Sequence, residues 1–159
     1  RFRETALPAL RYATYCVINE IEAQEITGVV LRDGEGMLRE ENMAAALQAI
    51  LRAGVGKWAV IHTPEASFGM LPSGEMYRER GAKLAHGYIK GTVGAGDAFC
   101  AGVLCIAHAG GTLPQALRAG NATACASLRL TDATTGVLPL PEALRLYDQL
   151  CHLCEPEDV

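Results

Sequence analysis

Apolar residues follow two patterns along the chain, short continuous runs and longer segments with helical spacing. Residues 12–18, entered through residues 6–10, and residues 58–62 are apolar runs that predict buried strands. Residues 67–71 and 75–80 predict a returning hairpin, because Pro72-Ser73-Gly74 between them is a turn sequence. Helical spacing predicts helices over residues 20–27, 40–53, 94–109, 113–130 and 141–153, the first two ending at Gly28 and Gly54. This order predicts an α/β fold with an antiparallel hairpin at one edge of its sheet.

Length and charge narrow the classes of protein that fit. A chain of 159 residues can bury a core of its own and is expected to form one domain. The net charge is −4 and no basic run occurs, so nucleic acid is not an expected partner. No apolar stretch reaches the roughly 20 residues that span a bilayer, and residues 1–4 do not begin a signal peptide. Because the first residue is Arg, we expect a piece of a longer protein.

The six cysteines favour a reducing compartment over a disulfide framework. Cys16, Cys100, Cys105 and Cys125 lie among aliphatic residues, where cysteine acts as a small hydrophobe. Residues 151–154, CHLC, have the spacing of zinc ligands but no second Cys/His pair, so a helix end before an acidic tail is preferred. We therefore expect a cytoplasmic protein with reduced thiols.

Segment 91–99, GTVGAGDAF, is the strongest candidate for chemistry. Its glycines come directly before an apolar helix, and free amides at a helix N-terminus bind anions. Asp97 beside such an anion can take a proton from an attacking hydroxyl, although it can also serve as a helix-capping carboxylate. Gly94, Ala95 and Gly96 would supply the amides, with positive φ or close ligand approach expected at Gly96. The combination points to phosphoryl transfer rather than a plain glycine turn.

Two other glycine-loop motifs fit less well. A Walker loop has Lys after its last glycine, whereas this chain has Asp97. A dinucleotide fingerprint has a third glycine where this chain has Phe99.

Residues 92–99, TVGAGDAF, closely resemble the C-terminal signature of the ribokinase-like (PfkB) carbohydrate kinases, Asp-Thr-x-Gly-Ala-Gly-Asp-x-Phe. Residues 16–23, CVINEIEA, resemble the Asn-x-x-Glu motif of the same family. The resemblance covers nearly the whole chain but only the C-terminal half of the family's usual length. It implies a Rossmann-like, ribokinase-type three-layer α/β sandwich with a mostly parallel sheet. Residues 1–159 would be the C-terminal nucleotide-binding and catalytic part, without the N-terminal sugar-binding part and the lid.

The resemblance also implies roles for individual residues. Asp97 would be the general base, Glu22 would contact Mg²⁺ through water, and Asn19 would contact the phosphates. On sequence alone, Glu22 reads as a solvent-facing helix residue. The residues expected at the nucleotide are Asn19, Thr63, Gly69, Thr92, Gly94, Gly96 and Asn121. Asn121 resembles a residue that flanks adenine, and a local hydrogen bond within the helix is an equal alternative.

Two departures from the family pattern affect these expectations. Gly91 replaces the first Asp of the signature, which helps to hold a monovalent cation in some relatives, so potassium dependence is in doubt. Residues 62–69, HTPEASFG, replace the usual Thr-Leu-Gly-x-x-Gly, with Pro64 and Glu65 in place of Leu-Gly and one extra residue. ATP is still expected near Thr63 and Gly69.

The sequence therefore predicts a kinase that uses ATP and Mg²⁺ to phosphorylate a sugar or sugar-like primary alcohol. A nucleoside kinase of the same superfamily is the alternative in chemistry, and a nucleotide-binding module without turnover is the alternative in class. The isolated chain is expected to be inactive. The full-length protein could form a homodimer, and neither membrane nor nucleic acid is an expected partner.

Overall fold

The computed structural model describes residues 2–152, and these divide between two compact units, Arg1–Arg78 and Glu79–Val159. The first unit contains the helices α1 (Phe2–Ala9), α2 (Glu20–Thr27) and α3 (Met43–Arg52), and the short 3-10 helices η1 (Leu10–Tyr12) and η2 (Glu40–Asn42). The second contains α4 (Ala95–His108), α5 (Leu113–Ser127) and α6 (Leu140–His152). The strands are β1 (Tyr15–Asn19), β2 (Trp58–His62), β3 (Ala66–Met70) and β4 (Met76–Arg80).

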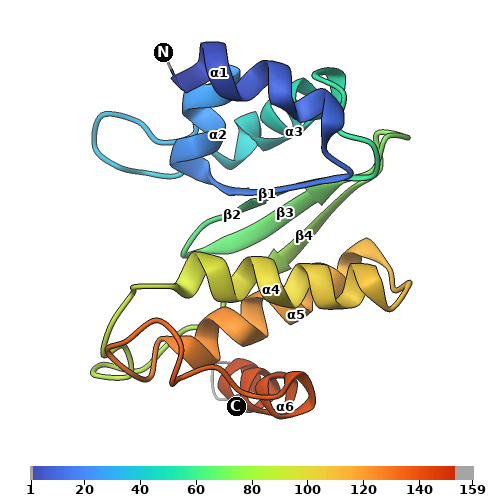
Figure 1. Ribbon diagram of the computed structural model, residues 1–159. Helices are drawn as coiled ribbons and strands as arrows, with labels where there is room; N and C mark the ends of the chain where they lie inside the picture. The colour runs from blue at the N-terminus through green and yellow to red at the C-terminus, as the bar shows by residue number, and fades with distance from the viewer. Residues whose placement is uncertain (1, 153–159) are drawn as a thin grey trace, which may run out of the picture. The chain divides into compact units, whose positions relative to one another are not determined.

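The four strands form one mixed sheet in the order β1-β2-β3-β4 (Figure 1). Strand β1 is parallel to β2, with Asn19 opposite His62, and β3 is antiparallel to β2, with Ser67 opposite His62. The hairpin predicted from residues 67–80 is thus present, within one residue of its expected ends. Within residues 2–152, the parallel part of the sheet is the pair β1–β2, so the sheet here is mixed rather than mostly parallel as the resemblance implied.

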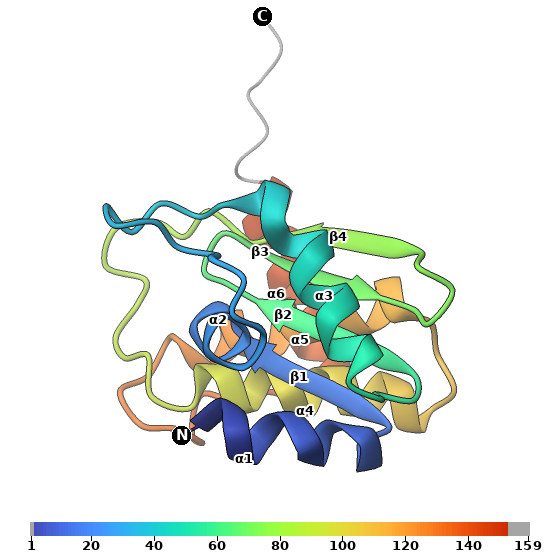
Figure 2. The same cartoon turned by 90° about the horizontal axis from the view of Figure 1, so that it is seen from above.

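The first unit has its core between the sheet and three helices. Helices α2 and α3 lie over one face of the sheet, and α1 lies next to α2, beyond the edge strand β1 (Figure 1 and Figure 2). Fully buried side chains from α3 and from β2, such as Leu47, Ile50 and Ile61, belong to one apolar cluster. The predicted helices over residues 20–27 and 40–53 are confirmed, the second beginning as a 3-10 turn. Gly28 and Gly54 follow them with positive φ angles of 78° and 115°, which glycine adopts without strain.

The N-terminal segment differs from its prediction. The expected strand over residues 12–18 begins only at Tyr15, and residues 2–9 form helix α1. Pro8 lies inside this helix, which sequence rules disfavour. Ala6 and Leu7 pack against the core, so tertiary burial offsets the lost helix hydrogen bond. Tyr12 is not in the strand and its side chain is 78% exposed.

The second unit is a stack of three helices in which α5 contacts both α4 and α6 (Figure 1). The backbones of α4 and α5 lie very close. A Cβ placed on Gly102 would lie 2.5 Å from Thr123 Oγ1 and 2.6 Å from the Ala119 carbonyl oxygen, and a Cβ on Gly120 would lie 2.7 Å from the ring of Phe99. Glycine is therefore required at both positions for this helix contact.

Helix α5 ends three residues before its predicted end. Leu128 follows the last helical residue, and the side chain of Arg129 donates to the carbonyl oxygens of Ala126 at 3.0 Å and Gly136 at 3.4 Å. A basic side chain that takes up carbonyl groups near a helix end stabilises that end. The periodic apolar pattern over residues 113–130 does not reveal this contact.

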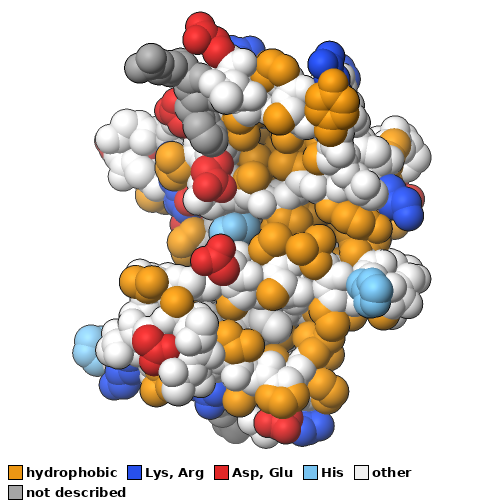
Figure 3. Space-filling model, viewed as in Figure 1, with side chains coloured by type: hydrophobic (Ala, Val, Ile, Leu, Met, Phe, Trp, Pro, Cys, Tyr) orange, Lys and Arg blue, Asp and Glu red, His pale blue; other side chains and the backbone are white. Residues whose placement is uncertain are grey.

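Among the described residues, no helix combines the length and the apolar character needed to cross a membrane. Cys16 and Cys125 are buried, as expected of small hydrophobes, and burial raises the pKa of Cys125 to about 11. Cys100 is half-buried and Cys105 is exposed, so the expected role of a small core hydrophobe does not hold for Cys105. The zinc-like spacing over residues 151–154 lies partly outside the described residues. Acidic and basic side chains are scattered over the face seen in Figure 3, with apolar side chains between them.

Candidate functional site

The glycine-rich segment forms a turn that leads into helix α4. Gly94 is the N-cap of α4 and has a left-handed φ of 79°. The Ala95 amide donates to the carbonyl oxygen of Thr92 at 3.2 Å, and the Ala98 amide donates to that of Gly94 at 2.8 Å. The positive φ that the sequence suggested at Gly96 is at Gly94 instead, and Gly96 lies in the first turn of α4. One of the three predicted anion-binding amides, that of Ala95, thus already has a partner in the turn.

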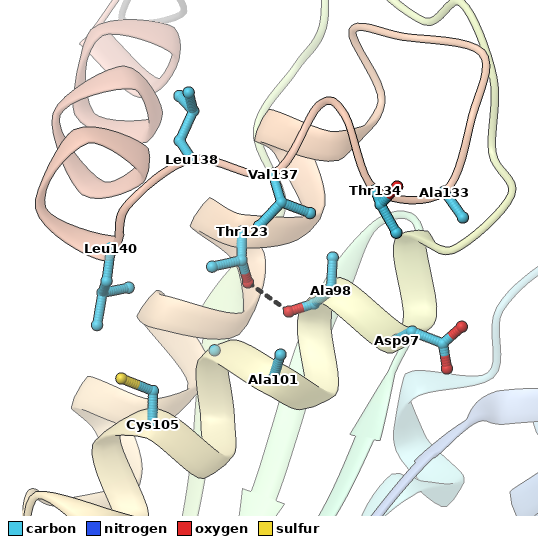
Figure 4. A pocket seen from close by; sticks show the side chains of 11 residues that line it. Asp97, Ala98, Ala101, Cys105, Thr123, Ala133, Thr134, Val137, Leu138 and Leu140 are labelled. Carbon is cyan, nitrogen blue, oxygen red and sulfur yellow. Dashed lines mark hydrogen bonds between the residues drawn. The ribbon is translucent and has the colours of Figure 1, made fainter.

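Asp97 is the third residue of α4, and it is exposed. Figure 4 shows its carboxylate pointing away from Thr123 and from the interior of the helix pair. Its side chain makes no capping bond at the N-cap, where Gly94 stands. A carboxylate in the first turn still interacts favourably with the helix dipole. Asp97 is therefore held on a rigid helix and remains accessible to a ligand.

A cavity of about 370 Å³ lies between α4, α5 and the segment before α6 (Figure 4). Its walls are mostly apolar, with Ala101, Val137 and Leu140 among them, while Asp97 and Thr134 contribute polar side chains. The Thr123 hydroxyl in its wall donates to the Ala98 carbonyl oxygen at 2.7 Å, which ties α5 to the first turn of α4. The cavity therefore borders the helix turn that presents Asp97.

The Asn-x-x-Glu motif forms a capping box at the start of α2. Asn19 Oδ1 accepts from the Glu22 amide at 2.8 Å, and Glu22 Oε2 accepts from the Asn19 amide at 2.9 Å. Glu22 is exposed, and its Oε1 and the Asn19 Nδ2 lie outside the box. The motif thus has a structural role, and it also presents a carboxylate oxygen and an amide at the carboxyl end of β1. Oxygen donors of this kind suit Mg²⁺, which takes few protein ligands.

Thr63 and Gly69, which were expected in one loop, lie in a turn and in a strand respectively. Thr63 follows β2, and its Oγ1 accepts from the amides of Glu65 and Ala66 at 3.1 Å each while donating to the Ala66 carbonyl oxygen at 3.0 Å. Gly69 is buried in β3, where it is paired with Val60. The expected loop therefore reduces to a tight turn over residues 63–65, and Gly69 lies in a strand rather than in that loop.

Asn121 is buried in α5 and bonds to distant parts of the second unit. Its Nδ2 donates to the Arg80 carbonyl oxygen at 3.2 Å and lies 3.3 Å from Tyr147 Oη. Tyr147 Oη also donates to the Arg80 carbonyl oxygen, and burial raises the pKa of this phenol. The alternative of a local helix bond is wrong, since these partners come from β4 and α6.

An ion-pair network around Arg32 was not predicted. Its guanidinium binds Glu20, at the start of α2, and Glu65, in the turn after β2. The hydrogen bond from Arg32 lowers the pKa of Glu65 to about 2. Arg32 lies between the helices predicted over residues 20–27 and 40–53, and Glu65 stood out in the sequence only as a departure from a family pattern. Burial lowers the pKa of nearby His62, although the charges of Glu20 and Glu22 act in the opposite direction.

Most of the predicted site residues thus form two groups, one in each unit, while Gly69 and Asn121 belong to neither. Asn19, Glu22 and Thr63 gather at the carboxyl ends of the parallel pair β1–β2, the edge at which α/β proteins bind ligands. Thr92, Gly94, Gly96 and Asp97 gather at the start of α4. Within residues 2–152, no cluster of three or more His, Cys, Asp or Glu residues has the form of a metal site. A metal here would depend on water and phosphate for most of its ligands.

Comparison with solved structures shows the same fold in several kinases. Escherichia coli phosphofructokinase-2, solved with potassium, matches with a TM-score of 0.73 and 19% identity over 92% of this chain and 45% of that one. Arabidopsis thaliana ribokinase, solved with ribose and ATP, matches with a TM-score of 0.71 and 20% identity over 87% of this chain and 42% of that one. Schistosoma mansoni adenosine kinase, solved with 2-fluoroadenosine, matches with a TM-score of 0.68 and 19% identity over 87% of this chain and 40% of that one. The chain thus spans less than half the length of each of these three structures.

These likenesses confirm the predicted ribokinase-like α/β fold class. A search of curated proteins gave no match. A family model described as pfkB family carbohydrate kinase matches residues 1–140. Because that model matches most of the length of this chain, the chain belongs to the pfkB family of carbohydrate kinases.

Proposed function

We propose that this chain is the nucleotide-binding and catalytic part of a kinase that transfers the γ-phosphoryl group of ATP to a primary alcohol of a sugar or sugar-like molecule. The observation that carries the proposal is the exposed carboxylate of Asp97, held in the first turn of α4 directly after the Gly94 turn. That placement combines a base with a helix N-terminus that favours anions.

Asp97 would accept the proton of the attacking hydroxyl. The amides of Gly94 and Gly96 would donate to the phosphoryl oxygens and stabilise their charge, and the Ala95 amide would join them by exchanging its bond to the Thr92 carbonyl oxygen. Because phosphoryl transfer depends mainly on positioning and charge stabilisation, a rigid helix start is well suited to it.

Asn19 and Glu22 would help to bind the phosphates and the Mg²⁺ of the nucleotide. The carboxylate oxygen of Glu22 outside the capping box would receive a water ligand of Mg²⁺, and the Asn19 amide would donate to a phosphate. When bound, Mg²⁺ would neutralise phosphate charge. Thr63 and Asn121 remain proposed neighbours of ATP, although both side chains already order the protein itself.

A nucleoside is the second candidate acceptor, because the adenosine kinase structure resembles this chain about as well as the sugar kinases do. A nucleotide-binding module without turnover is the third candidate. An assay of ATP consumption with sugars and nucleosides as acceptors, run on this chain and on the full-length protein, separates the three. The sugar proposal requires turnover with a sugar in the full-length protein, and loss of that turnover in the chain alone.

The Asp97→Asn substitution tests the catalytic assignment. It keeps the size of the side chain and removes the base, so turnover in the full-length protein should fall by a factor of about 10² or more while ATP affinity stays near the wild-type value. Asp148→Asn is the matched control, because Asp148 is an exposed carboxylate on α6 that pairs with Arg118. If Asp97→Asn turns over at the wild-type rate, Asp97 is not the base.

Potassium is proposed to have little effect. The structure of phosphofructokinase-2 was solved with potassium, but this chain has Gly91 at the first position of its signature. A Cβ on Gly91 would lie 2.9 Å from the Cα and the carbonyl oxygen of Thr131, so the backbone of residues 130–131 occupies the space that a side chain would need. For the same reason Gly91→Asp would disturb the turn and is not a clean way to introduce a carboxylate.

We expect activity of the full-length protein to differ by less than about threefold between sodium and potassium buffers, a difference below roughly 0.7 kcal/mol. The buffers must be matched in ionic strength, because general screening would otherwise imitate a specific effect. A strong requirement for potassium would show that other oxygen atoms replace the missing carboxylate.

A further inference from the structure

Arg32 uses its whole guanidinium group to join three segments of the first unit. Nε and Nη2 donate to Glu20 Oε1 at 3.0 and 2.7 Å. Nη1 and Nη2 donate to the two carboxylate oxygens of Glu65 at 2.7 and 2.8 Å. Nη1 also donates to the Gly36 carbonyl oxygen at 3.1 Å. An arginine has five N–H donors, and every one of them has an acceptor here.

The backbone of Arg32 is itself held in place. Its amide donates to Gln24 Oε1 of helix α2 at 3.2 Å, and the Leu31 amide donates to the same oxygen at 2.8 Å. An isolated bridge pairs Arg32 with Leu38. The guanidinium is therefore presented from a fixed position.

The partners of Arg32 lie beside the proposed nucleotide residues. Glu20 directly follows Asn19 and precedes Glu22, and the Glu65 amide donates to Thr63 Oγ1. Asn19 is paired with His62 across the parallel strands, so these segments leave the same end of the sheet. The side chains of Arg32 and Glu20 are only 16% and 10% exposed, which makes this contact harder for water to replace than a surface ion pair.

We propose that Arg32 is a positioning residue for Mg²⁺·ATP: its guanidinium holds the start of α2, with Asn19 and Glu22, and the turn of Thr63 in one arrangement. It also offsets the negative charges of Glu20 and Glu65, which neighbour the residues proposed to serve the nucleotide. This inference rests on the proposed function, and it requires no contact between Arg32 and the nucleotide.

Lysine cannot replace arginine in this role. An ammonium group keeps the positive charge but has three donors on a single atom, so it cannot bind two carboxylates and a carbonyl in the planar arrangement seen here. Arg32→Lys therefore removes the geometry and keeps the charge. Arg78→Lys is a matched control, because Arg78 binds Glu40 through Nε at 3.1 Å and Nη2 at 2.9 Å, and in the described part of the chain its guanidinium has no hydrogen bond or ion pair with a proposed site residue.

The test combines calorimetric titration with Mg²⁺·ATP and backbone amide exchange on the full-length protein. Residues that orient metal-binding groups typically change affinity by 10- to 100-fold, so Arg32→Lys should raise the Kd for Mg²⁺·ATP by about tenfold or more. The amides of Glu22 and Ala66, which bond to Asn19 and Thr63, should exchange faster than in the wild type. Arg78→Lys should leave the Kd and both exchange rates within about twofold of the wild type.

The possible outcomes are distinct. Equal exchange at Glu22 and Ala66 in the two variants would show that Arg32 does not order these segments, and the proposal would be overturned. Faster exchange with an unchanged Kd would leave Arg32 a purely structural role, which also overturns it. A wild-type protein that does not bind Mg²⁺·ATP would refute the proposed function, and the positioning role with it, whatever the exchange rates show.

If Arg32→Lys fails to fold, Glu65→Gln provides the second variant. Glu65 lies at the exposed end of the network, with 47% of its side chain accessible, so this change should be tolerated. It weakens one arm of the network and should shift the Kd and the Ala66 exchange rate in the same directions by smaller factors. No shift in either quantity would overturn the proposal.

Discussion

At the scale of single residues, Gly94 is the position at which the turn before α4 most clearly needs glycine. Its φ of 79° is in the left-handed region, and a Cβ there would lie 2.7 Å from Ala133 Cβ and 2.8 Å from the Ala133 carbonyl oxygen. The motif marks three glycines as important, but it does not distinguish conformational need from close packing. In the structure, Gly94 has both a left-handed φ and close packing, whereas Gly91 is restricted by packing and has no left-handed φ.

The pair Gly94→Ala and Gly87→Ala separates these two effects. Gly87 has the same φ of 79°, but nothing lies within 4 Å of a Cβ placed there. Gly87→Ala should therefore lower the free energy of unfolding by about 1–2 kcal/mol, the strain of an alanine in this conformation. Gly94→Ala should lower the free energy of unfolding by about 1–3 kcal/mol more than Gly87→Ala does, because Ala133 must also move. Urea denaturation measures both, and equal losses would show that the segment around Ala133 adjusts freely.

At the scale of secondary-structure elements, the Asn19–Glu22 motif has one observed role and one proposed role, which sequence cannot separate. It caps α2 and it presents the polar atoms proposed to serve Mg²⁺ and phosphate. Helix α5 begins with a second capping box, formed by Thr112 and Gln115, which carries no proposed site residue. The two boxes allow the structural contribution to be measured alone.

Asn19→Ala and Thr112→Ala should each lower the free energy of unfolding by about 1 kcal/mol, since each removes an N-cap acceptor. Glu22→Gln should change stability little, because a glutamine oxygen can replace Oε2 in the box. It should nevertheless raise the Mg²⁺ concentration needed for half-maximal activity of the full-length protein, by about tenfold. If Glu22→Gln has the same Mg²⁺ dependence as the wild type, the motif only caps the helix.

Helices whose ends are marked by capping or stop residues in the sequence were predicted accurately. Helix α2 has its predicted bounds, because Asn19 supplies a cap at one end and Gly28 a left-handed stop at the other. Helix α1 was missed, since Pro8 argues against a helix and only the packing of Ala6 and Leu7 overrides it. The end of α5 was missed because it depends on the side chain of Arg129, beyond the helix.

At the scale of the whole molecule, the family could be predicted because its signatures are short and continuous in sequence. Segment 91–99 alone identifies the turn, the helix start and the exposed carboxylate of Asp97. Contacts over long separations could not be predicted in this way. Arg32 meets Glu20 and Glu65 across 12 and 33 residues, and Asn121 meets Arg80 across 41. No periodicity in the sequence records which of many charged or polar residues becomes a partner.

The close approach of α4 and α5 has a consequence for motion. Gly102 lies against Ala119 and Thr123, Gly120 lies against Phe99, and Thr123 holds the Ala98 carbonyl oxygen. Two helices packed this closely over residues 98–102 and 119–123 cannot slide or rotate past each other without breaking all of these contacts at once. The two helices therefore move as one rigid body, and Asp97 lies in the first turn of α4 at one end of it. Any movement of Asp97 toward a ligand must be hinged in the segments that enter and leave the pair.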